Sequence, residues 1–438
     1  MALCNPVVVV PGITASRLRD EYPASPEIVW NALKKDFRRV SLHPEDIRYE
    51  LIEPARVRPD AAFTVVYEDL LEELRYNLSD AEDRPVPVYP FAYDWRQPLE
   101  TTEALLARFI DEVIDRTKLL GHYHRADYAD EPKVDLVGHS MGGLIIAGYL
   151  ANAGPDARVG KVATLGSPFR GSLEAPLKIT TGTADLGESE PSASREREAA
   201  RLTPALYYLL PNFDGAVDPQ DPGIPADLFN SNAWQESVVD TLASFIKNHG
   251  VERTNRGERV TRAAELFDTL LQSAKSHRRK LETLNLSDCR LTADDWLCIA
   301  GVDAETRVTL KVESHYNKPL FDLTNDDRKN QWQSKDDNAR FLTGDGTVPL
   351  RGAQPAFLDD VCLVCVRPKD FGYWEVKDRV LQRASGFHGM LPNLNLAHRL
   401  IVSHFRGRAQ KGTWGRAAPS VRPSAWKPAI SGLTRKDD

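Results

Sequence analysis

The pentapeptide GHSMG at residues 138–142 has the residue types and spacing that most clearly suggest covalent chemistry. It follows the predicted strand VDLV at 134–137 and precedes a helix-like apolar segment, 143–150. A nucleophilic serine on a tight turn between strand and helix needs small flanking residues, because side chains there would collide with neighbouring backbone. The helix also directs free N–H groups and its positive dipole end at the serine. The pattern predicts that Ser140 is a nucleophile rather than part of an ordinary glycine-rich turn.

A serine hydroxyl reacts well only when a base removes its proton and an acid orients that base. The chain order that accompanies such an elbow is serine, acid, histidine, which leaves His315, His388, His398 and His404 as candidate bases. His388 lies in GFHGM at 386–390, a loop after the last predicted strand, and catalytic residues gather in such loops. His398 and His404 lie on a predicted helix and are better explained by packing or surface roles. We therefore predict that His388 is the base.

Two aspartates are candidates for the acid. Asp303 stands just beyond the predicted strand 296–301, where strand-end geometry would place it, whereas Asp345 lies in the glycine-braced turn LTGDGTVP at 342–349. Either carboxylate can be explained instead as the cap of a turn. The residues alone barely separate the two, and the choice stays open at this point.

The elements that must position these residues follow from short apolar runs that alternate with helix-like segments. This alternation is typical of an α/β protein with a mainly parallel sheet. The predicted strands are 7–10, 86–89, 134–137, 162–165, 296–301 and 361–366, and the predicted helices are 99–120, 143–150 and 394–405.

Two further segments differ from this core pattern. Residues 172–295 contain no comparable strand-like run and end in an amphipathic helix at about 262–284, so we expect an insertion that covers one end of the sheet. The core would then consist of residues 1–171 and 296–405. Residues 406–438 carry eight Lys and Arg against two Asp, which favours a basic, loosely ordered tail.

Composition restricts the class of protein. The chain has 438 residues, 42% of them hydrophobic and 27% charged, with a net charge of −7. These values are typical of a globular protein and show no net-basic footprint for nucleic acid. The N-terminus lacks the basic start of a signal peptide, and the longest stretch free of charged residues, 136–155, contains His139, Ser140 and several glycines, so no transmembrane segment is predicted. A cytoplasmic location is the expectation.

The five cysteines are too sparse for a disulfide framework. Cys362 and Cys365 form a C-x-x-C, but they lie in the apolar run 361–366, and no second Cys/His pair at zinc spacing accompanies them. They are predicted to be core residues. We expect neither a metal nor an organic cofactor, and the oligomeric state is left open.

Six motifs in order resemble the lecithin–cholesterol acyltransferase family, whose relatives include phospholipid:diacylglycerol acyltransferases and lysosomal phospholipase/acyltransferases. The motifs are VVVVPGITASRL (7–18), PFAYDWR (90–96), VDLVGHSMGGL (134–144), TLGSPFRGS (164–172), LTGDGTVPL (342–350) and FHGMLPN (387–393). The resemblance implies an α/β-hydrolase fold in which residues 172–295 form a cap or lid.

The resemblance also implies roles for particular residues. The acid of the family sits in a D-G-T-V-like turn, which selects Asp345 over Asp303, and its histidine lies in an H-G motif that matches His388. The oxyanion hole of the family corresponds to the backbone N–H groups of Ile13 and Met141. For substrate binding, the resemblance suggests Trp95 as a wall residue, and the LYYLLP segment containing Leu206 and Tyr207 as part of an acyl channel or as buried cap.

The implied function is a serine ester hydrolase of lipase, phospholipase or esterase type, working through an acyl-Ser140 intermediate on an ester or lipid substrate. One alternative is transfer of the acyl group to an alcohol, and a second is a non-catalytic scaffold that binds a ligand or partner. Two departures from the family pattern are Ala15, where a glycine is usual, and the stretch 22–40, which lacks the cysteines of the lipid-binding loop in secreted members. Peripheral lipid contact is therefore left open.

Overall fold

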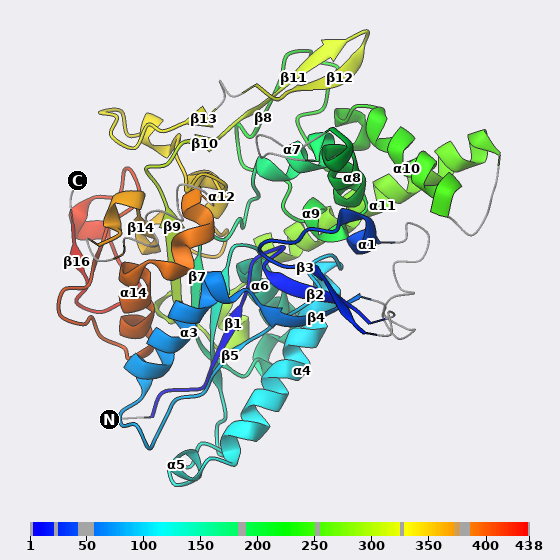
Figure 1. The fold of residues 1–438 in the computed structure, drawn as a ribbon. Helices are drawn as coiled ribbons and strands as arrows, with labels where there is room; N and C mark the ends of the chain where they lie inside the picture. The colour runs from blue at the N-terminus through cyan, green and yellow to red at the C-terminus, as the bar shows by residue number, and fades with distance from the viewer. Residues whose placement is uncertain are drawn as a thin grey trace.

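Six strands form the central sheet in the computed structural model (Figure 1). Their order is β14-β9-β7-β6-β1-β5, and every neighbouring pair is parallel. The strands are β1 (Val7–Val10), β5 (Val88–Pro90), β6 (Val134–His139), β7 (Val159–Leu165), β9 (Trp296–Gly301) and β14 (Val364–Val366). All six predicted strands are present, with β5 and β14 starting later than predicted. The structure describes residues 3–21, 25–42, 57–182, 190–249, 255–324, 328–372, 375 and 386–436.

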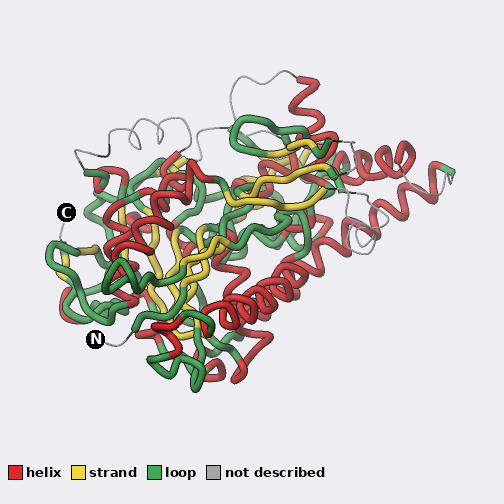
Figure 2. Tube along the Cα trace, turned by 60° about the horizontal axis from the view of Figure 1, so that its bottom comes forward, coloured by secondary structure: helices red, strands yellow, loops and turns green. Residues whose placement is uncertain are grey.

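Helices cover both faces of this sheet (Figure 2). The side chains of β1 show why its four residues are all apolar: Val8 and Val10 pack with α4 (Leu99–Lys118) and α6 (Met141–Ala153). Val7 and Val9 pack on the opposite face with α3 (Thr64–Leu78) and α14 (Asn395–Phe405). Because alternate residues of a strand point to opposite faces, a strand buried on both sides reads as a continuous hydrophobic run. This arrangement establishes the predicted parallel α/β core.

The segment between β7 and β9 forms a helical layer at one end of the sheet. Its helices are α7 (Glu174–Thr181), α8 (Glu190–Arg201), α9 (Pro204–Tyr207), α10 (Ser237–His249) and α11 (Arg256–Glu282). The long helix α11 packs against α6, and the buried carboxylate of Glu103 on α4 accepts hydrogen bonds from His277 Nε2 at 2.6 Å and Lys280 Nζ at 2.7 Å. The cap is therefore tied to the core along α11, while α10 and the start of α11 project from the body (Figure 1).

The inserted segment also contains a strand that the sequence did not reveal. β8 (Val217–Pro219) pairs in parallel with β11 (Leu310–His315), which in turn pairs with β12 (Lys318–Asp322). Three residues with one large apolar side chain are too few to show a strand pattern. As a result, the chain just after β9 packs with the insertion, not only with the core as the predicted boundaries implied.

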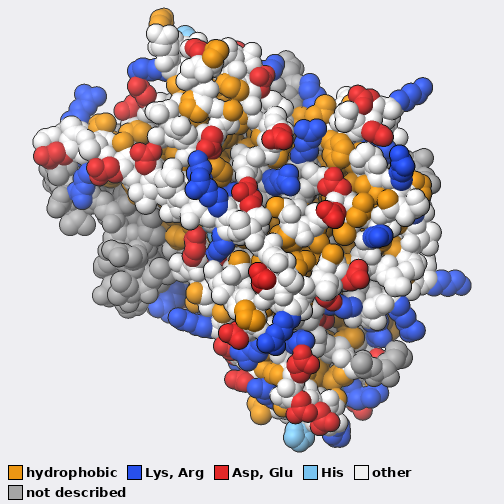
Figure 3. Space-filling view, turned by 180° about the vertical axis from the view of Figure 1, so that it is seen from behind, with side chains coloured by type: hydrophobic (Ala, Val, Ile, Leu, Met, Phe, Trp, Pro, Cys, Tyr) orange, Lys and Arg blue, Asp and Glu red, His pale blue; other side chains and the backbone are white. Residues whose placement is uncertain are grey.

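The remaining short elements complete the outer layers. An antiparallel sheet of β3-β2-β4 follows β1, and the short helix α1 lies between β3 and β4 in the chain. These elements are β2 (Ser16–Asp20), β3 (Glu27–Trp30), α1 (Phe37–Val40), β4 (Val57–Ala62), α5 (Gly121–His124), β10 (Thr306–Arg307), β13 (Arg328–Lys329), α12 (Leu350–Ala353), β15 (Trp414–Gly415) and β16 (Thr434–Arg435). Viewed from behind, basic and acidic side chains are interspersed over the surface (Figure 3). Among the described helices, none is long and apolar enough to cross a membrane.

The C-terminal segment differs from the expected loose tail. Within residues 406–436, β15 pairs with β16. The segment also contacts the core: Arg416 O accepts from Cys365 N in β14, and Trp426 Nε1 donates to Leu363 O. Arg416 makes a bidentate ion pair with Asp370 at 2.7 and 3.0 Å, and both side chains are only 2% exposed. The basic composition did not reveal this packing, because the carboxylate that pairs with Arg416 comes from another part of the chain.

The ion pair between Arg416 and Asp370 supports a stability prediction. Arg416→Ala leaves a buried carboxylate without its partner and should lower the free energy of unfolding by about 3–5 kcal/mol. Arg422→Ala, an exposed arginine of the same segment, is the control and should change it by less than about 0.5 kcal/mol. Urea unfolding measures both. Equal stability of the two variants would show that this segment does not pack as described.

Candidate active site

Ser140 lies on the turn between β6 and α6 and has a left-handed backbone conformation, with φ 53° and ψ −126°. The neighbouring glycine is required sterically, because a Cβ on Gly142 would collide with the carbonyl oxygen of Val10 in β1. The amide of Ser140 donates to Leu165 O at the end of β7, 2.9 Å away. The turn is therefore held by the strands on both sides of β6 and raises the serine above the carboxyl end of the sheet.

The three residues singled out from the sequence as nucleophile, base and acid lie together. Ser140 Oγ is 2.9 Å from His388 Nε2, and His388 Nδ1 is 2.7 Å from Asp345 Oδ2. Nδ1 donates to the carboxylate, which leaves Nε2 as the acceptor of the serine proton. The three are 7%, 9% and 1% exposed, respectively. Water therefore competes little with these hydrogen bonds, and the arrangement can deprotonate a serine hydroxyl for attack on a carbonyl carbon.

Asp345 is fixed by the turn that contains it. Its second oxygen, Oδ1, accepts from the amides of Thr347 at 3.0 Å and Val348 at 2.7 Å. Its carbonyl oxygen accepts from His388 N at 3.0 Å. One carboxylate oxygen is thus held by backbone amides while the other faces the imidazole.

Asp303, the other candidate, has different partners. Its Oδ1 accepts from Asn330 Nδ2 at 3.1 Å, its Oδ2 lies 3.9 Å from Arg367 Nη1, and its amide donates to Thr343 Oγ1 at 3.0 Å. The structure therefore brings Asp345 to His388 and directs Asp303 to a neighbouring polar cluster. The strand-end rule therefore pointed to a residue whose described contacts do not include His388.

The two candidate oxyanion donors, the N–H groups of Ile13 and Met141, come from turns that adjoin Ser140. Met141 is the first residue of α6, so its N–H has no acceptor within the helix. Ile13 follows Gly12, where a Cβ would lie only 2.9 Å from Ser140 Cβ, so the turn containing Ile13 passes directly over the nucleophile. Within the described residues, neither N–H donates to a backbone carbonyl. These two groups can donate to an oxygen that becomes negatively charged near Ser140.

The turn around Ile13 is held at several points. Tyr93 Oη donates to Pro11 O at 2.8 Å, and Trp30 Nε1 donates to Thr14 O at 2.8 Å. Trp95, predicted as a wall residue, is buried with its ring 4.8 Å from that of Trp30. Trp95 is therefore connected to the oxyanion turn through Trp30, which contacts both.

Leu206 and Tyr207, predicted to bind substrate, lie on α9 in the interior of the cap. Tyr207 Oη donates to Arg201 O at 2.8 Å, and its ring packs edge-on against Phe267 with 6.0 Å between centroids. In the first turn of α9, the amide of Ala205 donates to Arg96 O of the core at 3.5 Å. The described contacts of Tyr207 are thus those of a buried cap residue rather than of a residue facing Ser140.

Two residues that the sequence reasoning missed contact the site from beneath. Tyr67 Oη lies 2.9 Å from both Gly12 N and His139 Nδ1, and His139 Nε2 lies 3.0 Å from His388 O. His139 occupies the variable position of the G-x-S-x-G motif, so the motif could have drawn attention to it. Tyr67 has no local signal, because only folding brings α3 next to the turn at Gly12.

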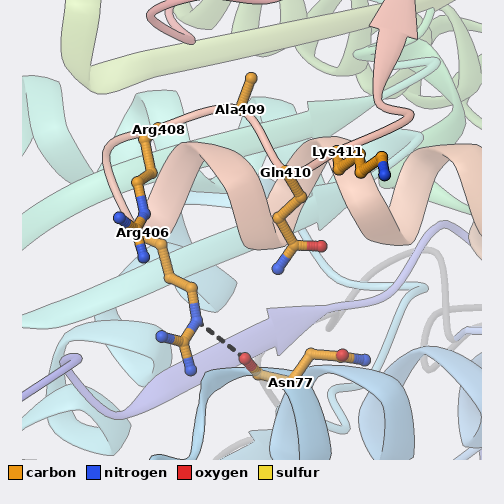
Figure 4. Close-up of a pocket in the computed structure, with 6 residues that line it drawn as sticks. All are labelled: Asn77, Arg406, Arg408, Ala409, Gln410 and Lys411. Carbon is orange, nitrogen blue, oxygen red and sulfur yellow. Dashed lines mark hydrogen bonds between the residues drawn. The ribbon is translucent and has the colours of Figure 1, made fainter.

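The cavities at the opposite end of the sheet do not belong to this site. Figure 4 shows one of about 430 Å³ between Asn77 on α3 and the segment after α14, where Arg406 Nε donates to Asn77 O at 2.8 Å. A second, of about 520 Å³, shares Arg406 and reaches Asp135 and Lys161 near the starts of β6 and β7. Ligands of open α/β sheets bind at the carboxyl ends of the strands, where Ser140 stands. No group of metal-ligating side chains occurs among the described residues.

The parallel sheet flanked by helices, with a serine on the turn after a central strand, defines an α/β hydrolase. The chain belongs to the lecithin:cholesterol acyltransferase family, because the model of that family matches residues 66–354. This match confirms the resemblance seen in the six motifs and shows membership of an ester-acting, acyl-transferring serine hydrolase family. Ser140 and Asp345 fall within the matched range, and Ile13 and His388 fall outside it.

One solved structure adds support for the fold. A chain of the structure described as the Tle4–Tli4 complex is similar, with a TM-score of 0.60 and 16% identity over 92% of this chain and 98% of that one. A chain of the lin2722 gene product from Listeria innocua is also similar, with a TM-score of 0.20 and 13% identity over 56% of this chain and 79% of that one. No curated protein matches the sequence.

The contrast between the two aspartates can be tested by amide substitution. Asp345→Asn should lower kcat by roughly 10⁴ in a folded protein, because the histidine loses the carboxylate that sets its tautomer and stabilises its protonated form. Asp303→Asn keeps the size of the side chain and should cost less than about tenfold. Ester hydrolysis by both variants, with circular dichroism as a control for folding, measures the difference. A larger loss in Asp303→Asn would contradict the arrangement described.

Proposed function

We propose that this protein is a serine ester hydrolase with Ser140, His388 and Asp345 as its catalytic triad. The observation that carries the proposal is the continuous chain of hydrogen bonds from Ser140 Oγ through His388 to Asp345, at 2.9 and 2.7 Å. Hydrogen bonds of this length are within the reach that proton transfer requires. Membership of an acyl-transferring family supports the same assignment.

In the proposed reaction, His388 Nε2 accepts the proton of Ser140 Oγ as this oxygen attacks the ester carbonyl. The N–H groups of Ile13 and Met141 donate to the resulting oxyanion, and Asp345 stabilises the imidazolium. Collapse breaks the ester bond, and the departing alcohol takes the proton from His388. Water then attacks acyl-Ser140 in the same way, which releases the acid and restores the serine.

Transfer of the acyl group to an alcohol is the second candidate, because the same intermediate serves both reactions. Family membership supports it. We place hydrolysis first, since water is the one acceptor that needs no binding site of its own. Supplying an alcohol and measuring free acid against new ester separates the two fates.

Replacement of the nucleophile tests the proposal itself. Ser140→Ala should lower turnover by about 10⁶ and abolish labelling by a fluorophosphonate probe, because both need the same oxygen. Ser403→Ala, which removes a buried hydroxyl on α14, is the matched control and should be labelled like the wild type. Labelling and ester turnover are measured together. A wild-type protein that is not labelled would favour the non-catalytic scaffold instead.

We extend the proposal to lipid esters presented at a membrane surface. The turn between β3 and α1 exposes Leu33 almost completely, at 98%, beside the exposed side chains of Lys34 and Lys35. Asn31 fixes this turn, since its Oδ1 accepts from the amides of Leu33 at 2.8 Å and Lys34 at 2.6 Å. A rigid apolar tip flanked by cations suits contact with an anionic bilayer, into which the leucine inserts.

Vesicle binding tests this extension. Leu33→Asp should weaken binding to vesicles rich in anionic phospholipid by about tenfold or more, because insertion of a leucine contributes about 1.5–3 kcal/mol. Turnover of a soluble short-chain ester should stay unchanged. Leu119→Asp, at an 84% exposed position just past the end of α4, is the control and should bind like the wild type. Equal binding by all three proteins would rule out this turn as a membrane contact.

A further inference from the structure

A line of three buried hydrogen bonds connects the oxyanion turn to the candidate base. It runs from Gly12 N to Tyr67 Oη at 2.9 Å, from Tyr67 Oη to His139 Nδ1 at 2.9 Å, and from His139 Nε2 to His388 O at 3.0 Å. Tyr67 and His139 are both almost completely buried. The line includes His139, the residue immediately before Ser140.

The direction of each hydrogen bond is determined by its neighbours. A carbonyl oxygen can only accept, so His139 Nε2 carries a proton and donates to His388 O. Burial, together with nearby His388, lowers the pKa of His139 to about 3, so the ring is neutral and Nδ1 has a lone pair. Tyr67 must then donate to Nδ1, and its oxygen accepts from Gly12 N. One arrangement of protons satisfies every group.

The two ends of this line are the parts whose relative position matters for acyl transfer. At one end, Gly12 precedes Ile13, the proposed oxyanion donor. At the other end, the main chain of His388 is held twice: its N–H donates to Asp345 O, and its C=O accepts from His139. Tyr67 lies on α3, and its hydroxyl connects the turn at Gly12 with His139, two segments that are far apart in the sequence.

We propose that Tyr67 and His139 are positioning residues that set the distance between the oxyanion donor at Ile13 and the imidazole of His388. The inference rests on the proposed function, since it assigns a purpose to contacts around the same triad. Neither residue touches the substrate. Both act through the main chain of residues that do, where displacements of about 0.5 Å already reduce catalysis.

The neutral state of His139 fits this role. Its ring centroid lies 5.0 Å from that of His388. When His388 takes up the serine proton, a second positive charge at this distance would oppose it. A neutral imidazole that donates to the main chain of His388 provides support without that repulsion. A lysine or arginine in the same place would hold the backbone but disfavour the imidazolium.

The competing explanation is that these bonds only stabilise the fold. Two other buried residues of the same types provide controls, because each makes a side-chain hydrogen bond to a main-chain carbonyl away from Ser140. Tyr123 Oη donates to Cys4 O at 2.8 Å, at the far end of β1, and His404 Nδ1 lies 2.8 Å from Ala429 O. Removing their polar atoms lowers stability without moving the oxyanion turn.

The experiment compares Tyr67→Phe and His139→Phe with Tyr123→Phe and His404→Phe, using a soluble short-chain ester. The first pair should lower kcat by about 10- to 100-fold, somewhat less than the loss of a whole oxyanion donor, with KM changed less than about threefold. Both should also bind a boronic acid, which mimics the tetrahedral intermediate, correspondingly more weakly. The control pair should lose thermal stability but keep kcat. The double variant of Tyr67 and His139 should lose no more than the worse single variant, because the two act as one unit.

Two results overturn the inference. One is a Tyr67→Phe enzyme with wild-type kcat and boronate affinity, whatever its melting temperature. The other is multiplicative loss of kcat in the double variant, which would mean independent roles. If His139→Phe fails to fold, Tyr67→Phe alone decides. Failure of the proposed function is a separate outcome, since Ser140→Ala would then retain turnover in the same assay.

Discussion

The left-handed backbone of Ser140 is the constraint on which the rest of the site depends. A non-glycine residue in this conformation costs of order 1–3 kcal/mol, so it persists only where the surroundings determine it. Here the surroundings are the central strands, since β1 and β7 flank β6 and α6 is buried along most of its length. Val10 O lies so close to Gly142 that no side chain fits between them. The order of the strands, their apolar residues and the glycines together hold the turn that contains Ser140.

The position of the cap depends on a second buried constraint. Glu103 is a fully buried carboxylate whose pKa is raised by burial but lowered overall by the hydrogen bond and charge of His277 and by the charge of Lys280. Gly148 on α6 leaves room for it, because a Cβ there would collide with the carboxylate. Removing Glu103 would leave its buried partner His277 without this acceptor. The cap therefore has a fixed side along α11.

How much of this the sequence predicts depends on how far apart the interacting residues lie in the chain. The strands around Ser140 and the helix after it follow from local patterns, because a doubly buried strand is apolar throughout. The choice between Asp345 and Asp303 did not follow from local geometry, since both stand on turns near strand ends. It took the family motif to choose Asp345, and the structure places that residue against His388.

What the sequence did not predict involves partners at least 46 residues apart in the chain. The positive charge of Arg416 suggested an exposed tail, but Asp370 pairs with it in the interior of the protein. β8 becomes a strand only when β11 lies beside it. Tyr67 shows the same principle at the site, because nothing near it in the sequence indicates that its hydroxyl will meet Gly12 and His139. Periodicity reports which side of an element is buried, not which polar group it meets there.

The burial of the triad connects these structural constraints to the fate of the acyl group. Ser140 and His388 are only 7% and 9% exposed, so the proposed acyl-enzyme would be attacked only by a nucleophile that reaches the buried His388 Nε2. Hydrolysis and transfer then differ in access and not in chemistry, because the base, the acid and the oxyanion donors are the same for water and for an alcohol. The residues that decide between the two reactions are accordingly expected around the triad, in segments such as the turn at Ile13, rather than in the triad itself.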